Sequence, residues 1–252
     1  MAIGNFSEET NGIFNQSLFD QSAVAKHKIG TIRTVSDGRV FAYAKAGAAL
    51  LSSELNQAAV PDSLASGCAV QATGTIGDKY INITYGAGAV ATKDYFKDGY
   101  ITTTTAAYGI GHVYKIKGHA AMTTGATVKV YLYDTVLATL TASTSKVILV
   151  KQPQDSVIQT VASNPTAANT GVNPIAVTIA YYFWNQVKGV CAVTTAGTVV
   201  VGNVVGASAT AGAVMPLAAG SSSIDVRPVL GQVLAVGATT GSSIIMLAIP
   251  GY

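Results

Sequence analysis

From residue 68 onward the chain consists of short runs rich in Val, Ile, Thr and Tyr, and glycines separate these runs. The clearest run is TVKVYLY, residues 127–133, in which Val and Leu alternate with Lys and Tyr. Such alternation is the pattern of a strand with one buried face, and β-branched residues favour strands. Turn signals recur about every 8–14 residues, the spacing typical of a sandwich or a small barrel. We therefore expect an all-β protein.

A length of 252 residues suffices for one large all-β domain or two small ones. We predict two β-rich units: residues 31–163 form the first and residues 175–252 form a barrel-like second. The linker between them is residues 164–174, NPTAANTGVNP, which has a proline near each end and no apolar periodicity. The polar residues 1–30 form an N-terminal arm. Within it, residues 14–27 are consistent with a short helix or with a segment that orders only on a partner.

Two local elements are predicted near the N-terminus. Residues 29–45 indicate a hairpin, because an Asp-Gly dipeptide, a strong turn signal, lies between two apolar runs. Residues 46–59, AGAALLSSELNQAA, are the best helix candidate, since Ala, Leu, Glu and Gln favour helices. In a helix Ala48, Leu51 and Leu55 would share one face.

Charge is scarce and unevenly placed. Charged residues make up 11% of the chain, against about 25% in a typical protein. Residues 152–252 carry only four, and residues 189–224 carry none. Because a monomer normally needs a charged surface to stay soluble, we expect this part to be covered by oligomeric contact. The alternative is a Thr/Ser-rich surface that is soluble without charge.

No residue pattern indicates catalysis or a metal. The two cysteines, Cys68 and Cys191, lie in apolar surroundings without a CxxC or Cys/His cluster, so we expect small buried side chains and no zinc site. His112 and His119 are seven residues apart, which places them on opposite faces of an unbroken strand. Nucleophile-elbow, Walker A and zinc-protease motifs are absent. We predict no catalytic residue, metal or cofactor, and therefore no enzyme.

Four consecutive aromatics, Tyr181, Tyr182, Phe183 and Trp184, form the largest concentration of bulky side chains. On a strand, Tyr181 and Phe183 would lie on one face and Tyr182 and Trp184 on the other. One pair fills a β core. The second face then needs a cover from another sheet or another subunit. An alternative is a carbohydrate-binding module in which Tyr182 and Trp184 stack on sugar rings.

Two stretches carry a resemblance to a known family. GTIRTVSDGRVFAYAKAGAALLSSELNQAA near the N-terminus and AVTIAYYFWNQVKGVCAVTTAGTVVVG near the C-terminus resemble structural proteins of tailed bacteriophages. The strand GHVYKIKGH between them fits the same pattern. The chain is similar in this respect to capsid decoration, or cement, proteins.

The resemblance implies a virion component on the outer surface of the capsid, synthesised in the host cytoplasm. Such proteins clamp neighbouring subunits of the major capsid protein, commonly as homotrimers. Tail or head-fibre components are the alternative. No nucleic-acid partner is expected at a net charge of +3 without a clustered basic stripe, and no membrane contact is expected because no long apolar span occurs. The candidate interface residues are Arg33, Arg39, Tyr43, Lys45, Tyr182 and Trp184.

Overall fold

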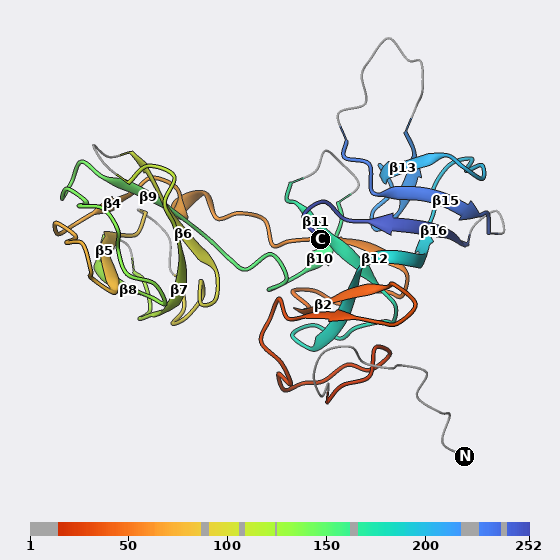
Figure 1. Ribbon diagram of the computed structural model, residues 1–252, viewed down its shortest axis with the longest axis horizontal. Coiled ribbons are helices and arrows are strands. Elements are labelled where there is room, and N and C mark those ends of the chain that lie inside the picture. Colours follow the sequence, from red (N-terminus) through yellow and green to blue (C-terminus); the bar gives the residue numbers. More distant parts are fainter. Residues whose placement is uncertain are drawn as a thin grey trace, which may run out of the picture. The chain divides into compact units, whose positions relative to one another are not determined.

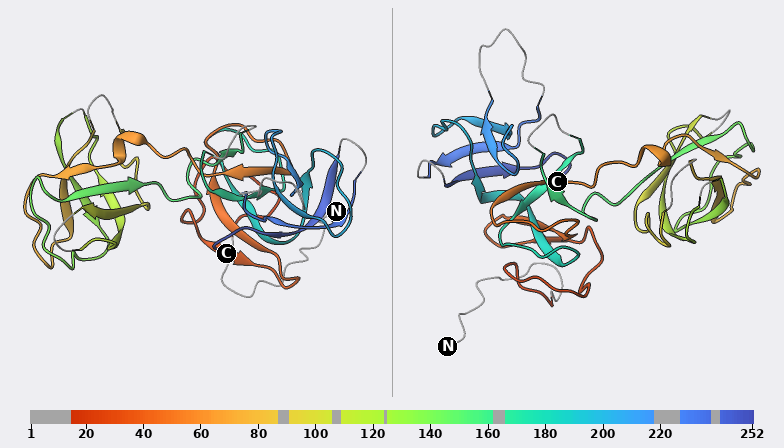
Figure 2. Two further views of the ribbon diagram at one scale, coloured as in Figure 1. Left: turned by 90° about the horizontal axis from the view of Figure 1, so that it is seen from above. Right: turned by 180° about the vertical axis from the view of Figure 1, so that it is seen from behind.

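A computed structural model describes residues 15–86, 91–105, 109–123, 125–161, 166–217, 227–237 and 241–252. The chain forms two compact units. Unit 1 combines the chain up to Ala59 with Pro153–Tyr252, and unit 2 is Val60–Gln152. The colours in Figures 1 and 2 show this division, because red and orange ribbon lies in the same unit as teal and blue ribbon. Unit 2 is therefore inserted into unit 1.

Unit 1 is built on one large sheet. Its strands are β1 (Ile32–Thr34), β2 (Val40–Lys45), β3 (Glu54–Gln57), β10 (Ile158–Gln159), β11 (Asn169–Asn173), β12 (Tyr182–Thr194), β13 (Val204–Ala207), β14 (Val214–Pro216), β15 (Gly231–Ala235) and β16 (Ser242–Ala248). The main path through the sheet is β10-β3-β11-β12-β16-β15-β13-β14, and β2 joins it by pairing with both β1 and β12. The long strand β12 pairs with β2 over its first half and with β16 over its second. It therefore links the N-terminal and C-terminal parts of the chain.

Unit 2 is a closed barrel in the order β4-β5-β8-β7-β6-β9. Its elements are η1 (Ser63–Ala65), β4 (Cys68–Val70), β5 (Tyr80–Thr84), β6 (Tyr100–Thr105), β7 (Val113–His119), β8 (Thr127–Leu132) and β9 (Lys146–Val150). The side chains of β8 are alternately exposed and buried, as the sequence pattern predicts. Its inward residues Val128, Val130 and Leu132 belong to the barrel's own hydrophobic core. The all-β prediction is thus confirmed, with a separate core in each unit.

The predicted division of the chain is wrong in its boundaries. Residues 31–59 do not belong with unit 2, because β2 pairs with β12 and β3 pairs with β11. Within the proposed linker, Asn169–Asn173 is strand β11 of the sheet in unit 1. The actual connections lie near residues 59 and 153. Because strand pairing joins residues more than 100 positions apart, local composition did not indicate this insertion.

The helix predicted for residues 46–59 is not formed. Instead Ala46 and Leu50 make isolated bridges to Val157 and Val177, and the segment ends in strand β3. A Cβ on Gly47 would lie 2.5 Å from the carbonyl oxygen of Ser156, so the two backbones approach closely there. Tertiary pairing therefore overrides helix propensity at this position. Within the described residues, the 3-10 turn η1 is the only helical element.

The predicted hairpin is confirmed, with Ile32–Thr34 paired to Val40–Ala42. Gly38 closes its turn with φ of +87°, a conformation that glycine adopts without strain. The predicted arm, residues 1–30, is only partly within the described residues. From residue 15 onward it packs on unit 1, with Gln16 and Leu18 buried, and it forms no helix there.

Candidate functional site

The aromatic strand β12 divides its side chains between two clusters. Phe183 is buried with Ala44, Leu50 and their neighbours, and Tyr181 packs against the same cluster. Trp184 is buried in a different cluster, against which Tyr182 packs. The predicted alternation of the four aromatics is therefore confirmed. Both faces of this part of β12 are covered within the chain itself.

The cover over Trp184 comes from the N-terminal segment. The indole Nε1 of Trp184 donates a hydrogen bond to the main-chain carbonyl of Gln16, at 3.1 Å. The hydroxyl of Tyr43 donates to Oε1 of the same Gln16, at 2.8 Å, and Nη1 of Arg33 donates to its carbonyl, at 3.0 Å. The ring of His27 lies against both Tyr43 and Trp184. No second subunit is needed to bury these side chains.

The candidate interface residues consequently fall into two groups. Arg33, Tyr43 and Trp184 are buried, so their assignment to an interface is wrong. The same burial excludes the alternative in which Trp184 stacks on a sugar ring. Arg39, Lys45 and Tyr182 remain partly exposed, although Arg39 already forms an ion pair with Asp37 at 2.7 Å.

A different part of unit 1 exposes an apolar surface. We define the apolar face as the outward side of β12, β16, β15 and β13, which carries Val190, Ile244, Met246, Leu234 and Val204. Between 41% and 48% of the surface of each of these side chains is exposed. Large exposed apolar patches on a protein mark interaction sites more often than single exposed residues do.

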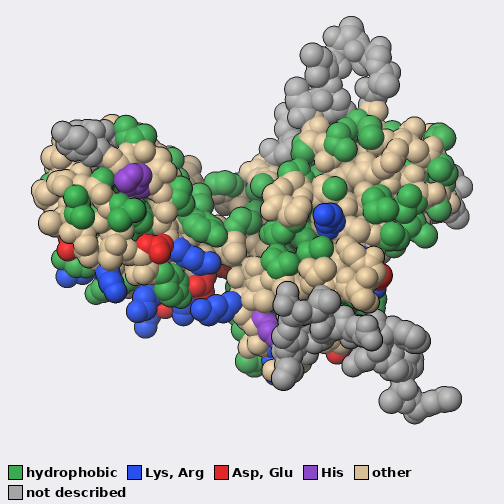
Figure 3. Space-filling model, in the orientation of Figure 1, with side chains coloured by type: hydrophobic (Ala, Val, Ile, Leu, Met, Phe, Trp, Pro, Cys, Tyr) green, Lys and Arg blue, Asp and Glu red, His purple; other side chains and the backbone are tan. Residues whose placement is uncertain are grey.

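Strand register makes this surface continuous. Val190 pairs with Met246, Met246 pairs with Gln232, and Gln232 pairs with Val204, so one row crosses four strands. Ala192 and Ile244 form the next row. Figure 3 shows mainly hydrophobic and uncharged polar side chains over the region of β13, β15 and β16.

Sequence analysis predicted a covered surface in this region but not its residues. The sequence signal that could have identified these residues is SSIIMLA in β16, where Ile244 and Met246 are as apolar as their buried neighbours Ile245 and Leu247. A strand with apolar side chains on both of its faces presents no polar face to water. Within the described residues of these four strands, Lys188 is the one charged side chain on this face.

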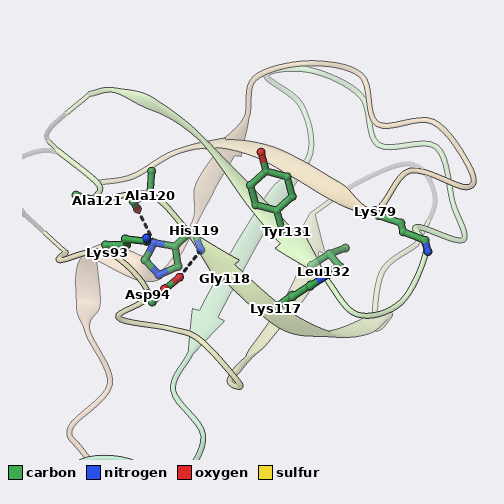
Figure 4. A pocket seen from close by; sticks show the side chains of 10 residues that line it. All are labelled: Lys79, Lys93, Asp94, Lys117, Gly118, His119, Ala120, Ala121, Tyr131 and Leu132. Atoms are coloured by element: carbon green, nitrogen blue, oxygen red, sulfur yellow. Dashed lines mark hydrogen bonds between the residues drawn. The ribbon is translucent and has the colours of Figure 1, made fainter.

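Unit 2 carries a groove with a volume of about 840 Å³. Figure 4 shows its lining residues, which are Lys79, Lys93, Asp94, Lys117, Gly118, His119, Ala120, Ala121, Tyr131 and Leu132. They come from the segments that precede β5 and β6, from the neighbouring strands β7 and β8, and from the two residues that follow β7. The sequence pattern did not indicate this groove.

Two polar residues of the groove have structural roles. Nε2 of His119 accepts a hydrogen bond from the main-chain N–H of Phe96 at 3.0 Å, so the proton of the neutral ring is on Nδ1, which donates to the carbonyl of Ala120 at 2.7 Å. Burial lowers the pKa of His119, which keeps the ring neutral. Oδ1 of Asp94 accepts the main-chain N–H of His119 at 3.0 Å.

The cysteine prediction is confirmed, since Cys68 and Cys191 are both free and buried. Burial raises the pKa of the Cys191 thiol to about 12. Within the described part of the chain, His, Cys, Asp and Glu form no cluster of three or more that would suit a metal. Nor do the described residues include a helix with the length and hydropathy of a membrane crossing.

Comparison with protein-family models, with curated proteins and with solved structures found no match to this chain.

Proposed function

We propose that this chain is a structural protein that works as an assembly, with copies joined through the apolar face of unit 1. The observation that carries the proposal is the continuous row Val190–Met246–Gln232–Val204, which crosses four strands without a charge. A face of this kind gains free energy when a partner covers it.

A second copy of the chain is the partner that this chemistry favours. An apolar face is exposed from the moment of folding, and copies of the same chain are always present at equal concentration. Interfaces in permanent homo-oligomers are also more apolar than those in transient complexes. Two uncharged faces meet without repulsion, and closed cyclic symmetry limits the number of copies.

The role that fits such an assembly is the one implied by the resemblance to phage structural proteins. A decoration protein binds the outside of a capsid and bridges subunits of the major capsid protein. An oligomer binds such a lattice through several equivalent contacts, which together give avidity. Arg39, Lys45 and Tyr182 are partly exposed and remain our candidates for the contact with the shell.

The location of the chain in phage particles tests this role. Virions of the phage that encodes it should show it on the capsid surface, with density at repeated lattice positions. Particles that lack the protein should release DNA on heating at a lower temperature than intact particles. Density confined to the tail would contradict decoration and would favour the tail or fibre alternative. Equal DNA release from both particles would leave no stabilising role.

A further inference from the structure

The groove of unit 2 is an open site with an excess of positive charge. Three of its lining residues are lysines, and all three are exposed. The single carboxylate, Asp94, already accepts the main-chain N–H of His119. Its volume of about 840 Å³ lies within the range of about 300–1,000 Å³ that small-ligand sites occupy.

A β-bulge in strand β7 forms part of the lining of this groove. A register shift between Ile116 and Gly118 makes Lys117 an extra residue, so Lys117 and Gly118 both point outward. Bulges of this kind re-aim side chains and are common beside binding sites. A Cβ at position 118 would lie 2.7 Å from Oδ1 of Asp94, so a larger residue here would have to displace this carboxylate.

The groove also has an aromatic and apolar part. Tyr131 is the cross-strand partner of Gly118, and 49% of its surface is exposed. The exposed Ala120 and Ala121 add apolar lining to the groove. In the view of Figure 4, Lys93 and Lys79 lie on opposite sides of Tyr131. The site thus combines a planar ring, which a ligand can stack on, with ammonium groups around it.

The charge of the whole unit matches the charge of the groove. Residues 60–152 contain eight lysines and five aspartates, with neither arginine nor glutamate. The net charge of +3 therefore resides in unit 2, and unit 1 is neutral. An anionic ligand is attracted to this unit.

We propose that the groove of unit 2 binds an acidic saccharide, with carboxylates paired to Lys79, Lys93 and Lys117 and a sugar ring on Tyr131. Lysine is a point charge that pairs with a carboxylate and with a phosphate alike. Three lysines around one ring fall short of the extended basic stripe that marks a nucleic-acid track, so a short acidic ligand fits the groove better.

An acidic peptide fits the unit less well than a saccharide. Extended peptides commonly bind by adding a strand to a sheet edge. Within the described residues, the six strands of unit 2 pair in a closed ring. This ring therefore offers no free edge strand to which a peptide could add. A saccharide needs only stacking and side-chain hydrogen bonds, which the groove provides.

Isothermal titration of the full chain with tetragalacturonic acid tests the proposal, with its methyl ester as the uncharged control. The acid should bind and the ester should not, and raised salt should weaken binding. Lys117→Gln should weaken binding of the acid about tenfold, the usual cost of one hydrogen bond to a charged group, and Tyr131→Ala should also weaken it. Lys146→Gln is the matched control, because β9 lies three strands from β8 in either direction around the barrel.

Three outcomes would overturn the proposal: no binding at millimolar tetragalacturonate, equal binding of acid and ester, or equal loss in Lys117→Gln and Lys146→Gln. Tighter binding of a poly-glutamate peptide or an oligothymidylate, weakened by Lys117→Gln, would assign the groove to those ligands instead. Thermal melting of each variant shows whether unit 2 is folded. The titration is independent of the apolar face of unit 1, so failure of either proposal leaves the other standing.

Discussion

The indole Nε1 of Trp184 donates a hydrogen bond to the carbonyl of Gln16, which lies 168 residues earlier in the chain. The two residues belong to strand β12 and to the segment that covers it. Gln16 also accepts from Tyr43 and donates through Nε2 to the carbonyl of Tyr182, at 3.0 Å. The N-terminal segment is therefore an integral part of the core of unit 1.

Trp184→Ala should destabilise unit 1 strongly, because the side chain is fully buried. The expected loss is about 3–5 kcal/mol, the usual cost of removing a buried large aromatic. Urea unfolding followed by circular dichroism measures it. Val113→Ala is the control, since Val113 is exposed in unit 2, and it should leave the midpoint unchanged. An unchanged midpoint for Trp184→Ala would refute the core assignment.

Unit 2 should fold when residues 60–152 are expressed alone. The barrel is closed, and its buried side chains form their own core. A dispersed amide NMR spectrum and a cooperative thermal transition would support this expectation. A chain that stays unfolded would show that unit 2 depends on unit 1.

The stability of unit 1 should fall as pH rises above the ordinary range of a glutamate. Burial raises the pKa of Glu54 above its usual value of 4.5. The folded state thus holds this proton more tightly than the unfolded state, so its contribution is present below pH 4.5 and is lost as pH rises through the higher folded pKa. Glu54→Gln should flatten this part of the profile of melting temperature against pH. Identical slopes in the two proteins above pH 4.5 would contradict the assignment.

Both cysteines should resist alkylation in the folded protein. Burial raises the pKa of Cys68 above its usual value and that of Cys191 to about 12, so little thiolate is present at pH 8. Mass spectrometry after iodoacetamide treatment should find both thiols modified only in denaturant. Rapid modification of either one under native conditions would contradict the burial.

The sequence predicted local structure better than long-range organisation. Alternation identified the faces of β8 and β12, because side-chain period follows directly from strand geometry. The pairing of β2 with β12 joins residues about 140 positions apart, such as Ala42 and Asn185, and no local pattern encodes it. The division into units and the burial of Arg33 and Tyr43 follow from that pairing. The predicted domain boundaries and the assignment of these two residues to an interface were therefore wrong.

The two surfaces were predictable to different degrees. The scarcity of charge after Lys188 indicated a surface to be covered, and the apolar face lies in that part of the chain. The groove depends on the bulge at Lys117, which brings two consecutive residues to the same side of β7. Strict alternation along a strand would place Lys117 and Gly118 on opposite sides of β7. The sequence pattern alone therefore could not reveal the groove.

The molar mass of the chain in solution tests the apolar face most directly. Light scattering on the eluting protein at micromolar concentration should give an oligomer for the wild type and a monomer for Met246→Glu, because a buried, unpaired carboxylate is costly. Leu137→Glu alters an exposed apolar residue of unit 2 and should keep the wild-type mass. A monomeric wild type, or a Met246→Glu variant with the wild-type mass, would contradict assembly through this face.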